Sequence, residues 1–155
     1  IESGGIMKKI FLLLITANLF FAHSAKEGDL EGAWILVEQA WNDEQVAIED
    51  PIPLKVFSQG RFFVSWNGAE NQSGFNEGTY ELANGEVLET ILNSSVRADI
   101  GNQVSYKPNF MGDKKSFYQE ITWTSPEGEN FTLFERWENV SCAEEKCARL
   151  RKFSD

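Results

Sequence analysis

The stretch "LEGAWILVEQAW", residues 30–41, opens the part of the chain that the sequence predicts to fold. It contains a Gly-x-Trp triplet, Gly32-Ala33-Trp34, followed by strand-forming residues up to Trp41. A glycine allows the chain to turn closely, and a tryptophan needs a large buried site. The stretch therefore predicts the first strand of the folded part.

The residues before this stretch read as an export signal. A basic Met7-Lys8-Lys9 precedes the apolar run "IFLLLITANLFF", residues 10–21, and then the small residues of "AHSA", 22–25. This order is typical of a secretory signal peptide, and the run is shorter than the about 20 residues of a membrane span. We expect cleavage near Ser24 or Ala25, a secreted or periplasmic protein without membrane insertion, and one folded domain over 26–155 after the upstream residues and signal of 1–25.

The chemistry of the expected mature chain is restricted. Its sole histidine, His23, lies in the signal, which argues against a Ser-His-Asp triad and against histidine-ligated metal or haem. Removing Lys8 and Lys9 from 14 basic residues, and Glu2 from 24 acidic ones, leaves a formal net charge of −11. Such a surface repels phosphate backbones and anionic lipids, so we expect no nucleic-acid partner. Because the expected mature chain has no histidine, we also expect no metal and no cofactor.

The remaining chain reads as closely spaced strands with short turns between them. The turn "SQG" and the pair Asn84-Gly85 are hairpin signals, and no long amphipathic helix pattern separates the runs. The strand-like runs number eight: residues 32–41, 54–57, 61–66, 74–82, 86–92, 102–111, 116–124 and 131–140. Within 116–124, Phe117, Ile121 and Trp123 share one parity.

Eight antiparallel runs in sequence predict an up-and-down meander that closes into an eight-stranded barrel. Such a barrel is wide enough to be filled by side chains or to hold one small ligand. Pro108 is an exception within its run, because proline has no N–H for a ladder. We expect it at a bulge or at a locally open seam.

The Gly-x-Trp opening of an exported chain with this strand count resembles the lipocalin (calycin) superfamily. The likeness is greatest to small secreted bacterial lipocalin-like domains of unknown function, through "GAW…L", "GTYEL…NGEVLET" and "ERWENV", and covers Gly32 to about Val140. The resemblance implies that Gly32 turns the chain under the barrel and that Trp34 plugs its floor. It also implies that Arg136, near the end of the last strand, packs across Trp34 in a cation–π contact.

The tail after the last strand, "SCAEEKCARLRKF", contains both cysteines, Cys142 and Cys147. In a regular helix their Cα atoms would be roughly 8–9 Å apart, whereas a disulfide needs less than about 7 Å. The tail is therefore a bridged loop or a helix with free thiols. An exported chain favours the bridge.

Acid–base residues for a reaction inside the barrel are present in the sequence. A carboxylate beside a tyrosine in a dry interior could act as an acid or a base, but the strand pattern does not show which residues face inward. A solvated strand residue is the commoner role, so we predict no enzyme and no catalytic residue. The residues considered are Glu81, Glu89, Glu120, Glu135, Tyr80, Tyr106 and Tyr118.

The wealth of aromatic residues favours a binding protein. We expect a barrel that holds a small hydrophobic or amphipathic molecule, and the alternative is a packed structural or protein-interaction domain without such a ligand. The interior volume distinguishes the two, since a cavity of about 300 Å³ or more favours a ligand. The expected lining consists of Trp66, Tyr80, Tyr106, Phe110, Phe117 and Trp123.

Overall fold

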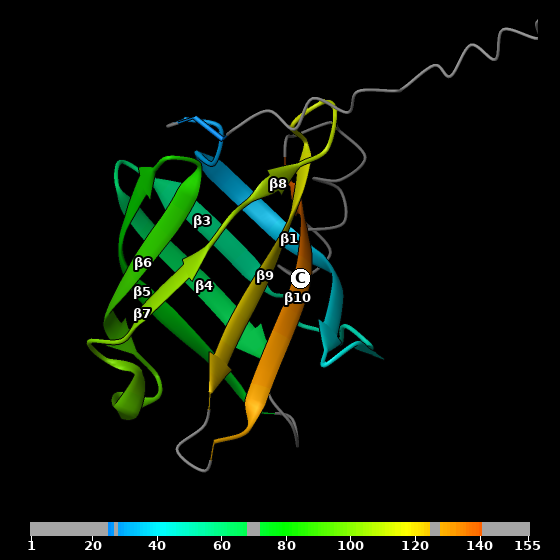
Figure 1. Ribbon diagram of the computed structural model, residues 1–155, viewed down its shortest axis with the longest axis vertical. Coiled ribbons are helices and arrows are strands. Elements are labelled where there is room, and N and C mark those ends of the chain that lie inside the picture. Colours follow the sequence, from blue (N-terminus) through cyan, green and yellow to red (C-terminus); the bar gives the residue numbers. More distant parts are fainter. Residues whose placement is uncertain (1–24, 27, 68–71, 125–127, 141–155) are drawn as a thin grey trace, which may run out of the picture.

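The computed structural model describes residues 25–26, 28–67, 72–124 and 128–140, and these residues form one curled antiparallel sheet (Figure 1). Residues 1–24 of the expected upstream and signal segment, and Cys142 and Cys147, lie outside the described residues. The elements are β1 (Gly32–Trp41), β2 (Glu44–Val46), β3 (Leu54–Ser58), β4 (Arg61–Asn67), β5 (Ser73–Ala83), β6 (Glu86–Ser94), the 3₁₀ turn η2 (Arg97–Asp99), β7 (Gln103–Tyr106), β8 (Asn109–Phe110), β9 (Ser116–Thr124) and β10 (Asn130–Asn139).

The sheet is a meander, as the sequence predicts. Its order is β7-β6-β5-β4-β3-β1-β10-β9-β8, so strands that follow one another in the chain are neighbours, and the first long strand pairs with the last. The prediction of a closed, eight-stranded barrel is wrong in its count and its closure. The path has nine strands, and β2 lies off it and pairs only with β1. The barrel is open between β7 and β8, the two ends of the path.

The open seam lies at Pro108. The predicted run over 102–111 is divided into β7, which pairs with β6, and β8, which pairs with β9. Lys107 and Pro108 separate the two pieces, because proline cannot donate to either ladder. Of the two places expected for Pro108, a bulge or a locally open seam, the structure shows the open seam.

The two hairpin turns that the sequence marks also form. Asn84 and Gly85 have φ of 54° and 77°, and Gln59 and Gly60 have φ of 51° and 74°. Two successive residues in the left-handed region are the mark of a tight hairpin turn whose twist matches the flanking strands. These turns set the register of β3 against β4 and of β5 against β6.

One end of the barrel is filled with aromatic side chains, and we call it the closed end. It is built around Trp34, Phe57, Tyr80 and Phe117, which are all buried. The Trp34 ring lies edge-on to Phe117 at 4.9 Å between centroids, and its indole N–H donates to the Leu30 carbonyl at 2.8 Å. The chain enters this end at Gly32, whose φ of +124° is one that other residues rarely adopt.

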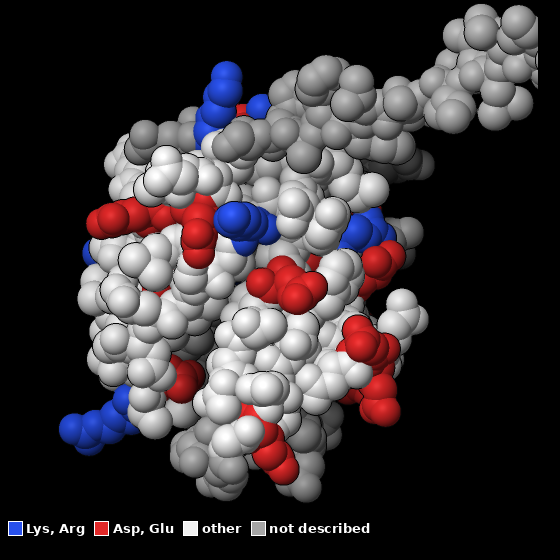
Figure 2. All heavy atoms as spheres, viewed as in Figure 1, with Lys and Arg blue, Asp and Glu red and all other residues white. Residues whose placement is uncertain are grey.

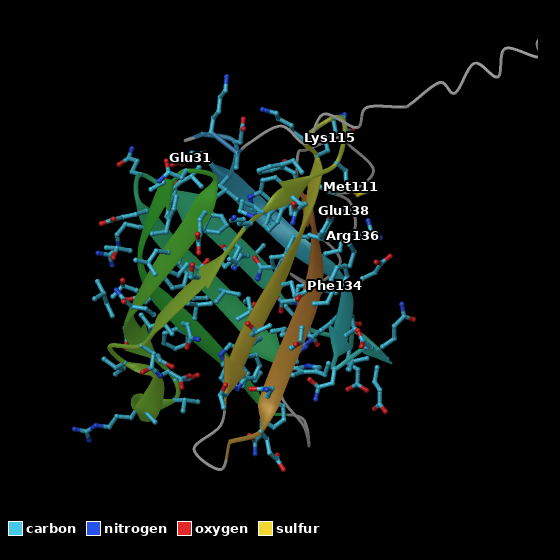
Figure 3. The ribbon with its side chains drawn as sticks, in the orientation of Figure 1. Glu31, Met111, Lys115, Phe134, Arg136 and Glu138 are labelled. Carbon is cyan, nitrogen blue, oxygen red and sulfur yellow. The ribbon has the colours of Figure 1, made fainter. Side chains whose placement is uncertain are left out.

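Arg136 does not take part in the closed end, so the predicted contact with Trp34 is wrong. On β10 the buried Trp137 alternates with Arg136, which puts the guanidinium on the outer face of the strand (Figure 3). There it forms ion pairs with Glu38 at 2.7 Å and with Glu138 at 3.0 Å. Lys55 is the cation that lies among the interior rings. It is on β3, directly opposite Trp34 on β1.

Candidate functional site

The middle of the barrel contains polar and charged side chains that water hardly reaches. Lys55 on β3, Glu89 on β6, Gln119 on β9 and Glu135 on β10 have exposed fractions of 2%, 4%, 0% and 9%. Each alternates along its strand with outward-facing neighbours, so four separate strands aim these groups at one place. We call these residues, with Tyr106, Gln39 and Trp137, the interior network.

Lys55 is the centre of the network. Its Nζ lies 3.0 Å from Glu89 Oε1 and donates to the Tyr106 hydroxyl at 3.2 Å and to Gln119 Oε1 at 3.3 Å. An ammonium has three N–H donors, and these three acceptors match them. The Nζ also lies 4.7 Å from the centroid of the Tyr106 ring and 5.5 Å from that of Trp137, within the range of a cation–π contact.

Tyr106 connects the ammonium to the first carboxylate. Its hydroxyl donates to Glu89 Oε1 at 2.6 Å while it accepts from Lys55. Burial, and next to it the charge of Glu89, raises the pKa of the Tyr106 hydroxyl well above its usual value. Tyr106 is therefore protonated at neutral pH and acts as a hydrogen-bond donor.

Glu135 is the second carboxylate, and it lies nearer to solvent than the rest. Its Oε2 accepts from Gln119 Nε2 at 2.8 Å and from Trp137 Nε1 at 3.1 Å, and its Oε1 accepts from Gln39 Nε2 at 3.2 Å. Burial raises the pKa of this carboxyl, and the Lys55 charge opposes the rise. Within the described residues every buried side-chain nitrogen or oxygen has at least one hydrogen-bond partner, so no polar atom of the network is left unpaired.

The other end of the barrel differs, and we call it the open end. Trp123 lies edge-on to Trp41 at 5.3 Å and stacks on Phe131 at 5.8 Å between ring centroids. Phe131 pairs with Trp123, and the pair Leu133 and Ile121 lies two residues further along the same two strands. Side chains two residues apart on a strand share a face, so Phe131 and Trp123 face inward as Leu133 and Ile121 do. A pocket of about 410 Å³ adjoins them, lined by Thr122, Trp123, Thr124, Asn130, Phe131 and Thr132.

The predicted lining residues are divided among the two ends and the middle of the barrel. Tyr80, Phe110 and Phe117 pack at the closed end, where Phe110 lies 5.6 Å from Phe117, whereas Tyr106 belongs to the interior network. Trp123 lies at the open end. Trp66 also lies there, against Gly74, where an added Cβ would come within 2.3 Å of the indole. The six residues therefore do not form one surface.

The acid–base candidates are divided between the two faces of the sheet. Glu89, Glu135 and Tyr106 belong to the interior network and Tyr80 to the core, whereas Glu81, Glu120 and Tyr118 are exposed. Figure 2 shows other acidic side chains spread over the visible surface rather than gathered in one patch.

Sequence reasoning missed Lys55, Gln119 and Trp137. For Gln119 a signal was present, because it shares the parity of Phe117, Ile121 and Trp123. For Lys55 the signal was weaker, because the residues on both sides of it, Leu54 and Val56, are as apolar as Phe57 two positions on. Burial of a lysine also requires partners from distant strands, which local patterns do not show.

In the part of the chain that the structure describes, no three histidine, cysteine, aspartate or glutamate side chains are grouped so that they could hold a metal ion. The described segments also contain no helix of the length and apolarity that crossing a membrane requires.

Comparison of the sequence with protein-family models and with curated proteins gave no match. Comparison of the structure with solved structures did. The chain is similar to a lipocalin-like protein from Bacteroides uniformis, at 17% identity and a TM-score of 0.48, over 73% of this chain and 100% of that one. It is also similar to an uncharacterized protein from Bacteroides eggerthii, at 16% identity and a TM-score of 0.44, over 72% of this chain and 100% of that one.

Proposed function

We propose that this protein is an exported binding protein that holds a small amphipathic molecule at the open end of its barrel. The observation that carries the proposal is a difference in exposure between inward-facing rings. Trp34 and Phe117 at the closed end are 1% and 0% exposed, whereas Trp41 and Trp123 at the open end are 37% and 40% exposed. Because only about two fifths of each of these residues is still in water, a ligand that covers them would gain on the order of 1 kcal/mol for each ring.

The size and the chemistry of the open end fit such a ligand. The pocket volume of about 410 Å³ lies within the range of about 300–1,000 Å³ that small-molecule sites occupy. Aromatic rings line its inward side, and threonine and asparagine side chains line the rest. Deeper in the barrel, Gln39 and Glu135 form a hydrogen-bonded polar layer that is not part of the pocket lining. Aromatic rings beside hydroxyl and amide groups, above this polar layer, favour an amphipathic molecule over a purely apolar one.

A second function is supported by one separate observation. Leu92, Val96 and Ile100, at the end of β6 and around η2, are 50%, 40% and 47% exposed. Exposed apolar side chains close together in the chain are typical of a protein-binding surface. In that case the interior network would serve stability alone, and the partner would be a protein.

Two matched variants test the proposed function. Trp123 and Tyr118 are on the same strand with similar exposed fractions, 40% and 41%, but on its inward and outward faces. We expect the neutral fluorescent probe N-phenyl-1-naphthylamine to bind wild-type protein. Trp123→Ala should raise its Kd at least about fivefold, a change near 1 kcal/mol. Tyr118→Ala should leave the Kd within about twofold.

The proposal fails if wild-type protein does not bind the probe, or if the two substitutions weaken binding equally. Equal weakening would mean that the probe binds scattered surface rings. Binding that survives Trp123→Ala and is lost in Leu92→Ser instead would support the protein-binding alternative.

A further inference from the structure

We infer that the molecule bound at the open end carries an ammonium group next to an apolar tail, and that Glu135 is the carboxylate that this ammonium meets. The inference rests on the proposed function and names the chemical class of its ligand. It is built from the position of Glu135, the charges around it, its remaining hydrogen-bond capacity and the rings above it.

Glu135 lies directly below the aromatic rim. On the inward face of β10 it follows Phe131 and Leu133 at steps of two residues. With a rise of about 3.4 Å per residue, its backbone lies roughly 7 Å below Leu133 and roughly 14 Å below Phe131. Of the four buried polar residues in the barrel it keeps the largest exposed fraction, 9%. Glu135 does not line the open-end pocket itself, so a ligand whose tail covers Phe131 has to extend past Leu133 to bring its head group to the carboxylate.

The charges at this floor favour a cation. The interior network contains Lys55 and the two carboxylates Glu89 and Glu135, which leaves an excess of one negative charge when both are ionised. The three donors of Lys55 are taken by Glu89, Tyr106 and Gln119, so they do not remain for an anionic ligand. The whole chain is acidic as well, with a formal net charge of −10.

The hydrogen bonds of Glu135 leave room for one more donor. An ionised carboxylate offers about four acceptor positions. Within the described residues Gln119, Trp137 and Gln39 occupy three of them, and Gln39 is alone on Oε1. The N–H of a primary ammonium can take the fourth position, whereas a second carboxylate would add only another acceptor.

The rings above the floor are also suited to a cation. Trp41 and Trp123 present indoles, whose faces attract cations more strongly than other aromatic rings do. An ammonium that enters past these indoles keeps favourable contacts while it loses water. The ligand class is therefore an organic amine that is protonated at neutral pH and has an aliphatic or aromatic tail.

The test uses three probes with the same tail: decylamine, decanol and decanoate, each displacing N-phenyl-1-naphthylamine below its micellar concentration. We expect wild-type protein to bind decylammonium at least tenfold more tightly than decanoate, with decanol between them. Glu135→Gln should reduce this preference to threefold or less and leave decanol affinity within about twofold. Glu120→Gln, an exposed carboxylate on β9, is the matched control and should keep the wild-type preference.

The outcomes separate this inference from the proposed function. If decanol and the fluorescent probe both fail to bind, the binding function itself is wrong. If they bind but decylammonium has no advantage, or if its advantage survives Glu135→Gln, the ammonium inference alone is wrong.

A second measurement applies if Glu135→Gln does not fold. In wild-type protein with ¹³C-labelled glutamate, decylammonium should shift one side-chain carboxyl resonance more than the others, and decanol should not. The absence of such a shift overturns the inference.

Discussion

The two ends of this barrel are made from the same residue types at the same inward-facing positions, yet only one end is covered. Trp34 and Phe117 are enclosed by the meeting of β1, β10 and β9 with residues 28–31 and β8. Trp41 and Trp123 meet edge-on and keep more than a third of their surface in water. Hydrophobic alternation decides which face of a strand turns inward, and the segments at each end decide whether that face is covered.

Tryptophan truncation at each end tests this comparison most directly, and it should give the largest effect. We expect Trp34→Ala to lower the free energy of unfolding by about 3–5 kcal/mol, because it leaves a cavity and an unpaired Leu30 carbonyl. Trp123→Ala should lower it by less than about 1 kcal/mol, since its ring is already half-solvated. Urea denaturation measures both, and equal losses would show that the ends do not differ in this way.

Between the two ends, removal of the buried cation should be nearly as damaging. Lys55→Met leaves the Glu89 carboxylate buried without its ion-pair partner, which costs about 3–5 kcal/mol in comparable sites. We expect the lower part of this range, because Tyr106 still donates to Glu89. Chemical denaturation at neutral pH measures the loss.

The double variant Lys55→Met/Glu89→Gln sharpens this prediction. The amide oxygen of the new glutamine can still accept from Tyr106, and no unpaired charge remains. The double variant should therefore recover at least half of the stability that Lys55→Met loses. No recovery would mean that Lys55 acts through its packing on Tyr106 and Trp137 rather than through its charge.

Glu135, in the interior network, should make the free energy of unfolding depend on pH. Its carboxyl pKa is raised above the ordinary value of 4.5, because burial outweighs the attraction of Lys55, and Glu89 adds to the rise. The folded state therefore holds the proton more tightly than the unfolded state does. The contribution of Glu135 to stability is largest below about pH 4.5 and is lost as the pH rises through the folded-state pKa.

Glu135→Gln removes this dependence. Gln39 can turn its amide to accept from the new side chain, so the hydrogen bonds need not be lost. Relative to wild type, the variant should gain stability as the pH rises from 4 to 8, and thermal unfolding at several pH values measures the trend. A difference in Tm that is the same at every pH, or one that Glu120→Gln also shows, would contradict it.

Much of the fold was accessible from the sequence because its signals are local. Alternating strands and the turn at Asn84-Gly85 depend on neighbours within a few residues, and the meander follows from short connections. The number and closure of the strands depend on distant partners. The prediction therefore missed β2 and the division of the run at Pro108 between two ladders, although it did expect an irregularity there.

The site was less accessible, for the same physical reason. Glu135 and Tyr106 were candidates from their residue types, but their burial depends on which strands lie across the barrel. Lys55 was not considered, because a lysine between two apolar residues is more often solvated than buried. Its three acceptors come from β6, β7 and β9, up to 64 residues away along the chain.

The smallest effect is expected at Arg136, where the resemblance to lipocalins implied a contact with Trp34. If that contact supported the closed end, Arg136→Gln would weaken the barrel by up to about 2 kcal/mol. The guanidinium instead bridges Glu38 and Glu138 on the outer face, where ion pairs are partly solvated and contribute about 0–1 kcal/mol. We therefore expect Arg136→Gln to lower stability by less than about 1 kcal/mol in low salt and by still less in 1 M NaCl, because salt screens exposed charges. Trp34 fluorescence should not change, since the indole and the guanidinium lie on opposite sides of the sheet. A loss that is large and independent of salt would mean that the closed end depends on its outer face as well as on its core.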